Sequence, residues 1–269
     1  MNQPFWKMHG AGNDFILIDD REQKFPDQDH DLIHRLATPK YGIGSEGVIL
    51  IQPSESADFR MRFYNPDGSE VEMCGNGARC VARLAHEIGA APDSMKFDTV
   101  AGVISAEIQE EDQVCLTMTP PKDLQLNAEL LLQGQPLAYH FVNSGVPHVV
   151  IEMPDLANQD IHSLGAAIRY HEAFQPKGTN VNFIEITGPD SLMIRTYERG
   201  VEAETLACGT GIAAGGLIAG SLGKASTPVK VTCAAGDILE VNYTATADAL
   251  ENVTLTGPAM HVFKGEIPL

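Results

Sequence analysis

Two short turns of the sequence carry residues suited to acid/base chemistry, Cys74-Gly-Asn-Gly77 and Cys208-Gly-Thr-Gly211. Each cysteine directly precedes a segment with helical spacing of apolar residues, so each thiol is expected at a helix N-terminus. The free amides and positive dipole there ease ionisation of a thiol and can hold a carboxylate. One such turn alone would favour a buried structural cysteine; two matching turns favour a pair of thiols that serve one bound molecule.

Two acid/base groups on opposite faces of one carbon suit the inversion of a stereocentre. One thiolate removes the Cα proton, and the opposite thiol returns a proton from the other side. The carbon acid is weak, so desolvation, the helix termini and positioning must stabilise the carbanion. Three cysteines remain, Cys80, Cys115 and Cys233. None has a cysteine at the matching position in the other half of the chain, so all three are interpreted as structural.

The elements that must position these thiols come from an internal repeat. The two turns lie 134 residues apart, and the repeat runs without a gap from Glu70/Glu204 to Ile104/Ile238. Apolar spacing predicts a central helix in each half, over 78–88 and 212–222, and peripheral helices over 32–37 and 161–170. Strands are predicted at 15–19, 48–51, 59–64, 96–108 and 113–118, and Pro120-Pro121 marks the linker. We therefore expect an α/β (α+β) fold of two similar halves that face each other, each a set of strands wrapped around one buried helix.

Composition limits the classes of partner. The chain has 269 residues, is 43% hydrophobic and carries a formal net charge of −18. Such a field repels nucleic acid and anionic membranes, so neither partner is expected. The first residues are not expected to form a signal peptide, and the odd number of cysteines in a chain of this size favours a reducing cytoplasm.

No cofactor is expected. The segment Gly42–Gly47 fits the dinucleotide pattern GxGxxG, but it precedes a predicted strand instead of opening a helix after one. No CxxC pair occurs, and the cysteines have no ligand-like spacing with histidine, so a metal site is not expected.

Three longer strings give the sequence a family resemblance. His9-Gly-Ala-Gly-Asn-Asp-Phe15, the run from Asn65 to Arg79, and the run from Tyr197 to Gly211 resemble the diaminopimelate epimerases, across the whole chain. The resemblance implies two pseudo-symmetric domains, 1–119 together with the tail 256–269, and 120–255. It implies a cofactor-independent epimerase that interconverts LL- and meso-diaminopimelate in lysine and peptidoglycan-precursor synthesis. A homodimer acting on a small amino-acid substrate is expected.

The resemblance also implies a role for each matched residue. Cys74 and Cys208 would be the acid/base pair, and Arg199 would clamp the distal carboxylate with a fork that lysine cannot copy. Glu198 would take the ammonium group, and His148 would support the site. The reacting carboxylate would be held by the amides of Gly75, Asn76, Gly209 and Thr210. The side chains that hydrogen-bond the substrate would be those of Asn13, Asn65 and Asn180.

Three departures from the family pattern bear on the choice of substrate. Val146 stands where the better-known pattern has a substrate-binding asparagine, and Gly47 where it has a glutamine. The segment 200–204 is one residue longer. Two alternatives stay open: a racemase of the same fold acting on another amino acid, and a non-catalytic thiol-bearing protein that closes on amino acids.

Overall fold

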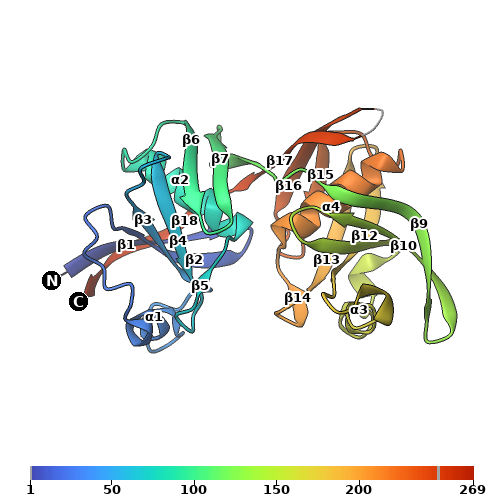
Figure 1. Ribbon diagram of the computed structural model, residues 1–269, viewed down its shortest axis with the longest axis horizontal. Helices are drawn as coiled ribbons and strands as arrows, with labels where there is room; N and C mark the ends of the chain where they lie inside the picture. The colour runs from blue at the N-terminus through green and yellow to red at the C-terminus, as the bar shows by residue number, and fades with distance from the viewer. Residues whose placement is uncertain (1, 247–248) are drawn as a thin grey trace. The chain divides into compact units, whose positions relative to one another are not determined.

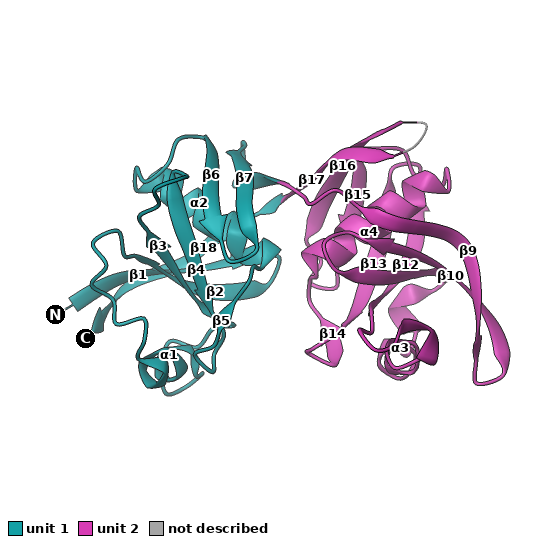
Figure 2. Ribbon diagram, in the orientation of Figure 1, with its two compact units in different colours: residues 1–116, 257–269 teal, residues 117–256 magenta. Residues whose placement is uncertain are grey.

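The computed structural model describes residues 2–246 and 249–269, and the chain divides into two compact units (Figure 1). Unit 1 is Met1–Leu116 with Gly257–Leu269, and unit 2 is Thr117–Thr256, as Figure 2 shows by colour. The chain therefore leaves unit 1 once and returns to it for the last strand. No helix within the described residues is long and apolar enough to cross a membrane.

Unit 1 is built from strands around one central helix. Its elements are β1 (Asn2–Gly10), β2 (Asn13–Asp19), α1 (His30–Ala37), β3 (Val48–Gln52), β4 (Phe59–Tyr64), β5 (Glu70–Val71), α2 (Gly75–Glu87), β6 (Ser94–Thr99), β7 (Gly102–Ile108), β8 (Gln113–Thr117) and β18 (Met260–Pro268). Strand β1 lies between β2 and β18, both antiparallel to it, while β2 pairs in parallel with β3.

The alternation of side chains along β2 and β3 explains why helices lie against both faces of this sheet. Phe15, Leu17 and Ile49 face the core that contains α2, whereas Ile16 and Ile18 face the core that contains α1. All five are at most 1% exposed. Helix α2 is therefore the buried centre of unit 1, and its N-terminus is held by the strands on which it packs.

Unit 2 repeats this plan. Its elements are β9 (Lys122–Leu132), β10 (Gln135–Asn143), β11 (Pro147–Glu152), the short helices η1 (Leu156–Asn158) and η2 (Glu172–Phe174), α3 (Ile161–Arg169), β12 (Asn180–Gly188), β13 (Ser191–Glu198), β14 (Ala203–Thr205), α4 (Gly209–Ser221), β15 (Val229–Thr232), β16 (Ile238–Ala245) and β17 (Leu250–Pro258). Strands β11 and β12 pair in parallel, as β2 and β3 do. In both units the connection between this parallel pair contains one α-helix, α1 or α3, and a second α-helix follows the short strand β5 or β14.

The repeat predicted from the sequence is confirmed by this topology, and with it a mixed α/β fold of two similar halves. Helix α4 carries no charged side chain and is buried from Gly211 to Ala219, packed against β10 to β13, β15 and β16. Helix α3 covers the opposite face of β11 and β12 through a second core that includes Val149, Ile151 and Val181. A buried central helix wrapped by strands is thus present in each unit.

Three details differ from the predicted elements. Helices α2 and α4 begin at Gly75 and Gly209, three residues earlier than expected, because the glycines of each turn lie inside the first helical turn. The predicted strand 96–108 is two strands, β6 and β7, joined by a tight turn before Gly102, whose φ is +116°. Pro120 and Pro121 directly precede β9, while the units divide between Leu116 and Thr117.

Candidate active site

Both predicted thiols stand at the first position before a central helix. Cys74 and Cys208 have extended backbones, with φ/ψ of −136°/122° and −111°/108°, and each precedes a helix of 13 residues. The first intrahelical bonds are made by Ala78 and Ile212, which donate to the Cys74 and Cys208 carbonyls at 2.8 Å. The three amides between each cysteine and that bond are not used by the helix ladder, and they point out of its N-terminus. Each turn therefore offers a cradle for an anion beside a thiol.

In unit 1, the cradle consists of the amides of Gly75, Asn76 and Gly77. A Cβ placed on Gly75 would meet no described atom within 4 Å, so the space beside its Cα is open. The side chain of Asn76 is turned inward and 3% exposed, and its Oδ1 accepts a hydrogen bond from Arg79 Nη2 at 2.9 Å. The side chain of Asn76 thus holds the buried Arg79, and the contact of its backbone amide with a ligand stays a prediction.

Asn13 has a fixed amide orientation at the start of β2. Its Nδ2 donates to a carboxylate oxygen of Glu46 at 2.5 Å, while its Oδ1 is buried with no hydrogen-bond partner among the described residues. Because a carboxylate accepts and cannot donate, the orientation leaves Oδ1 as an acceptor for an N–H group of a ligand. Gly47 stands where the family pattern has a glutamine, and the neighbouring Glu46 contacts Asn13 in the structure.

Asn65 lies in a tight turn directly after β4. Its amide donates to the Ser69 carbonyl at 2.9 Å, and its Nδ2 donates to the Ser69 hydroxyl at 3.3 Å. Gly68, with φ of +85°, closes this turn. The structure therefore gives Asn65 a turn-forming role, and its contact with substrate stays a prediction.

In unit 2, the predicted residues Asn180, Glu198 and Arg199 lie at neighbouring strand ends. Asn180 Oδ1 accepts a hydrogen bond from the Arg199 amide at 2.7 Å, which ties the start of β12 to the end of β13. Arg199 Nη1 donates to the Lys177 carbonyl at 2.9 Å. An arginine carries five N–H donors, so this bond orients the guanidinium and leaves further donors for a ligand.

The Glu198 carboxylate is set beside a hydroxyl in a poorly solvated place. Thr205 Oγ1 donates to its Oε2 at 2.9 Å. Burial raises the pKa of Glu198 above its usual range, and the Thr205 hydrogen bond opposes that effect in part. A carboxylate in such a place gains from a cation beside it, which fits an ammonium partner.

The Cys208 sulfur lies at the end of a buried hydrogen-bond chain. Its Sγ is 3.6 Å from Thr210 Oγ1, which is 2.9 Å from His148 Nε2. His148 Nδ1 is 3.0 Å from Asn182 Nδ2. His148 and Asn182 are fully buried, and Cys208 is 8% exposed. Burial, with the charge of Arg199, lowers the pKa of His148 to about 3, so its ring is neutral near pH 7.

The hydrogen-bond chain that ends at Cys208 requires glycine at position 211. A Cβ there would lie 2.4 Å from Asn182 Oδ1, a distance that no packing tolerates. In unit 1 the matching residue is Gly77, whose Cβ would approach the end of the Ile49 side chain at 2.8 Å. The same turn sequence therefore serves polar packing in unit 2 and apolar packing in unit 1.

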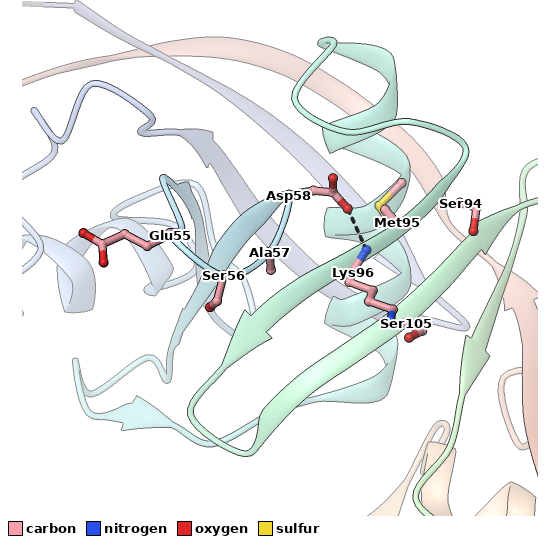
Figure 3. A pocket seen from close by; sticks show the side chains of 8 residues that line it. All are labelled: Glu55, Ser56, Ala57, Asp58, Ser94, Met95, Lys96 and Ser105. Atoms are coloured by element: carbon pink, nitrogen blue, oxygen red, sulfur yellow. Dashed lines mark hydrogen bonds between the residues drawn. The ribbon is translucent and has the colours of Figure 1, made fainter.

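The structure also contains a hollow away from the predicted residues (Figure 3). Its volume is about 480 Å³, and it lies beside the ends of β4 and β6. The Lys96 amide donates to the Asp58 carboxylate at 2.8 Å across one side of it. The lining is Glu55, Ser56, Ala57, Asp58, Ser94, Met95, Lys96 and Ser105. None of the predicted site residues is in this set, so the hollow is no part of the candidate site.

No group of three or more metal-ligating side chains occurs in the part of the chain that the structure describes.

The other cysteines lie apart from the helix N-termini. Cys80 and Cys233 are buried, and burial raises the pKa of Cys80 to about 12. A thiol with that pKa does not exchange protons near neutrality, which agrees with a structural role.

Solved structures show the class of fold first. A phenazine biosynthesis protein of the PhzF family from Bacillus anthracis has a TM-score of 0.76 at 15% identity, with both chains fully covered. A probable proline racemase from Agrobacterium radiobacter has a TM-score of 0.69 at 18% identity, over 99% of this chain and 93% of that one. At such identities the likeness defines the fold: the duplicated α/β architecture that these proteins share.

Sequence comparison then defines the family. The sequence model described as diaminopimelate epimerase matches residues 5–124 and 140–262. Diaminopimelate epimerase from Hydrogenobaculum sp. is 44% identical over 96% of both chains, and that from Chlorobaculum tepidum is 43% identical over 97% of this chain and all of its own length. The enzyme from Aquifex aeolicus is 40% identical over 98% of this chain and 97% of its own. The chain belongs to the diaminopimelate epimerase family, as its sequence motifs predict.

Proposed function

We propose that this protein is a cofactor-independent epimerase that inverts one Cα of diaminopimelate, with Cys74 and Cys208 as the acid/base pair. The observation that carries the proposal is the matched pair of helix N-termini, each with a cysteine directly before a cradle of amides. Interconversion of the LL and meso forms then serves lysine and peptidoglycan-precursor synthesis.

The reaction balances with two sulfurs. A thiolate accepts the Cα proton, the C–H bond breaks, and its electron pair delocalises into the adjacent carboxylate. The opposite thiol gives its proton to the other face of the carbon and becomes a thiolate. The amides of Gly75, Asn76, Gly209 and Thr210 at the helix N-termini stabilise the negative charge that develops on the carboxylate.

Recognition of the rest of the substrate falls to side chains with suitable charges. Arg199 pairs with the distal carboxylate, Glu198 with an ammonium group, and the Oδ1 of Asn13 accepts from an N–H. Asn65 and Asn180 add hydrogen bonds, and His148 supports Thr210. The hydrogen bonds that orient Asn13 and Arg199 support these roles. Asn13 presents an acceptor oxygen that suits an ammonium group, and Arg199 presents N–H donors that suit a carboxylate.

Solvent deuterium tests this function against its two alternatives. In D₂O the enzyme should place deuterium at Cα of diaminopimelate as epimerisation proceeds. Exchange confined to an amino acid that has no second carboxylate would support a racemase with another substrate. Binding of amino acids with no exchange into any of them would support a non-catalytic binding protein.

We further propose that the protein is a cytoplasmic homodimer. The thiol chemistry requires a reducing compartment, and Cys80, Cys115 and Cys233 form no disulfides. Val262 and Phe263 on β18 are 54% and 46% exposed, apolar surface of a kind that subunit contacts cover. Analytical ultracentrifugation decides the oligomeric state, and a sedimenting monomer at micromolar concentration would exclude the dimer.

A further inference from the structure

The direction of each hydrogen bond in the chain that ends at Cys208 can be worked out from its far end. Asn182 Nδ2 is 2.9 Å from the Val149 carbonyl oxygen, and a carbonyl can only accept. Thr196 Oγ1 lies 3.0 Å from Asn182 Oδ1 and donates to it. These two contacts fix the Asn182 amide with its NH₂ toward Val149 and toward His148.

This orientation determines the tautomer of His148. Since Asn182 Nδ2 donates, His148 Nδ1 must be the acceptor, and the ring is neutral. The ring proton is then on Nε2, which donates to Thr210 Oγ1. The Thr210 hydroxyl, having received that bond, directs its own proton along its remaining short contact, toward the Cys208 sulfur. The Ser144 hydroxyl donates to the backbone carbonyl of Thr210, so its contact is with the Thr210 backbone.

We propose that Asn182 is a positioning residue which, through His148 and Thr210, holds a hydroxyl donor on the Cys208 sulfur and so keeps Cys208 as the thiolate of the ligand-free enzyme. A donor aimed at sulfur stabilises the anion, which accepts the bond strongly, more than the thiol. The α4 N-terminus acts in the same sense. Asn182 is fully buried and its side chain bonds His148, Val149 and Thr196, so it acts on the sulfur through His148 and Thr210.

The catalytic consequence rests on the proposed function. Inversion with two thiols needs one base and one acid at the start, so a resting Cys208 thiolate makes Cys74 the resting acid. After one turnover the proton from Cα is on Cys208 and Cys74 is the thiolate. Water then takes the proton from Cys208 and supplies one to Cys74 to restore the resting form. The resting enzyme therefore begins with the diastereomer whose Cα proton faces Cys208.

The decisive experiment is alkylation of the ligand-free protein by iodoacetamide at about pH 5, where the thiolate is the minor form of Cys208 in every variant, followed by mass spectrometry of each cysteine. Cys115, half-buried and remote from the helix N-termini, is the internal reference. Loss of one hydrogen bond to a charged group lowers the thiolate fraction about tenfold. The higher nucleophilicity of the more basic thiolate offsets part of this, so labelling of Cys208 relative to Cys115 should slow about threefold in Thr210→Val.

Thr210→Ser is the matched control, because it keeps the hydroxyl and should label Cys208 at the wild-type rate. Asn182→Leu should slow Cys208 labelling as Thr210→Val does, whereas Thr196→Val, which leaves the Val149 contact of Asn182 in place, should not. In ¹⁵N spectra the His148 proton should be on Nε2 in the wild type and lose that preference in Asn182→Leu. A purely structural role for Asn182 would not move the tautomer.

Equal labelling of Cys208 in the wild type and Thr210→Val would overturn the proposal, as would equal slowing in Thr210→Val and Thr210→Ser. If Asn182→Leu does not fold, the pair at position 210 still tests the donor on the sulfur, and a His148 proton found on Nδ1 in the wild type would overturn the role of Asn182. Deuterium exchange into diaminopimelate is measured on the same proteins. The wild type could show the expected labelling pattern and still exchange no deuterium into any amino acid. That result would support the donor to Cys208 and refute the proposed function.

Discussion

Helices α2 and α4 begin with the same backbone and different surroundings. Cys74 and Cys208 share an extended conformation, and both helices make their first internal bond at 2.8 Å. At α2, the charged Arg79 donates to the Asn76 side chain and to the Pro258 carbonyl. At α4, a chain of uncharged donors ends at the Cys208 sulfur. The repeat has thus kept the amide cradle in both units, while the side chains have diverged in a way that distinguishes the two thiols.

The largest effect is expected when each of the two thiols is removed in turn. Cys74→Ala and Cys208→Ala should each lower epimerisation about 100- to 10,000-fold, since each removes one acid/base group. Circular dichroism should show both variants folded. Cys80→Ala, whose thiol is buried, is the control and should keep its activity apart from a loss of stability. Substantial epimerisation by either of the first two variants would exclude a two-base mechanism.

The second test concerns the charged clamp, which unit 2 alone carries. The corresponding turn of unit 1 has Asn65 after β4, where unit 2 has Glu198 and Arg199 at the end of β13. Arg199→Lys should lower kcat/KM for diaminopimelate about 10- to 100-fold, because a two-pronged contact becomes a point contact. A lysine variant that works nearly as well as the wild type would argue for a substrate with no second carboxylate.

The third test uses the buried histidine of unit 2. The folded pKa of His148, about 3, lies below the unfolded value near 6.5. Below pH 6.5 the unfolded chain takes up a proton that the folded chain refuses, so stability falls as pH falls toward 3. Between pH 7 and pH 5 the wild type should lose about 2 kcal/mol more of its unfolding free energy than His148→Gln. Urea unfolding at the two pH values measures this, and equal losses would contradict the burial of a neutral ring.

The smallest expected effect separates two matching glycines. Gly211→Ala should destabilise the protein by about 1–3 kcal/mol, since its methyl would meet Asn182 Oδ1 in a fixed polar network. Gly77→Ala should cost about 1 kcal/mol less, because the end of the Ile49 side chain can move aside. Thermal denaturation compares the two. Equal destabilisation would mean that the network around Asn182 is no more rigid than the apolar contacts in unit 1.

Much of the architecture could be predicted from the sequence because the repeat and the apolar spacing reflect the core directly. The buried stretches of α2 and α4 and the strands 48–51 and 59–64 are examples. The helix starts could not, because glycine is a poor helix former and the glycines of each turn conceal the first helical residues. The hairpin between β6 and β7 was not predicted because apolar residues, Val100 and Ala101, continue through its tight turn and leave no polar break there.

The position of both thiols before a central helix could be predicted because each cysteine precedes a repeated glycine turn and an apolar helical segment. Asn182 could not, since a single asparagine inside the apolar run of β12 has no distinguishing neighbours in sequence. Its importance arises from three contacts to other strands, with Val149 and His148 of β11 and with Thr196 of β13. The nearest signal in the sequence was the polar residue itself, within a segment otherwise suited to a core.

The return of the last strand to unit 1 has a consequence for synthesis on the ribosome. Strand β18 pairs with β1 along nearly its whole length, from Asn2 opposite Pro268 to His9 opposite Met260. Unit 2 is contiguous and is complete once residue 256 has left the exit tunnel, whereas unit 1 still lacks a strand at that moment. The usual order, in which the N-terminal domain is finished first, is therefore reversed. Until β18 emerges, β1 presents an unpaired edge, which exposes the nascent N-terminal half to wrong strand pairing.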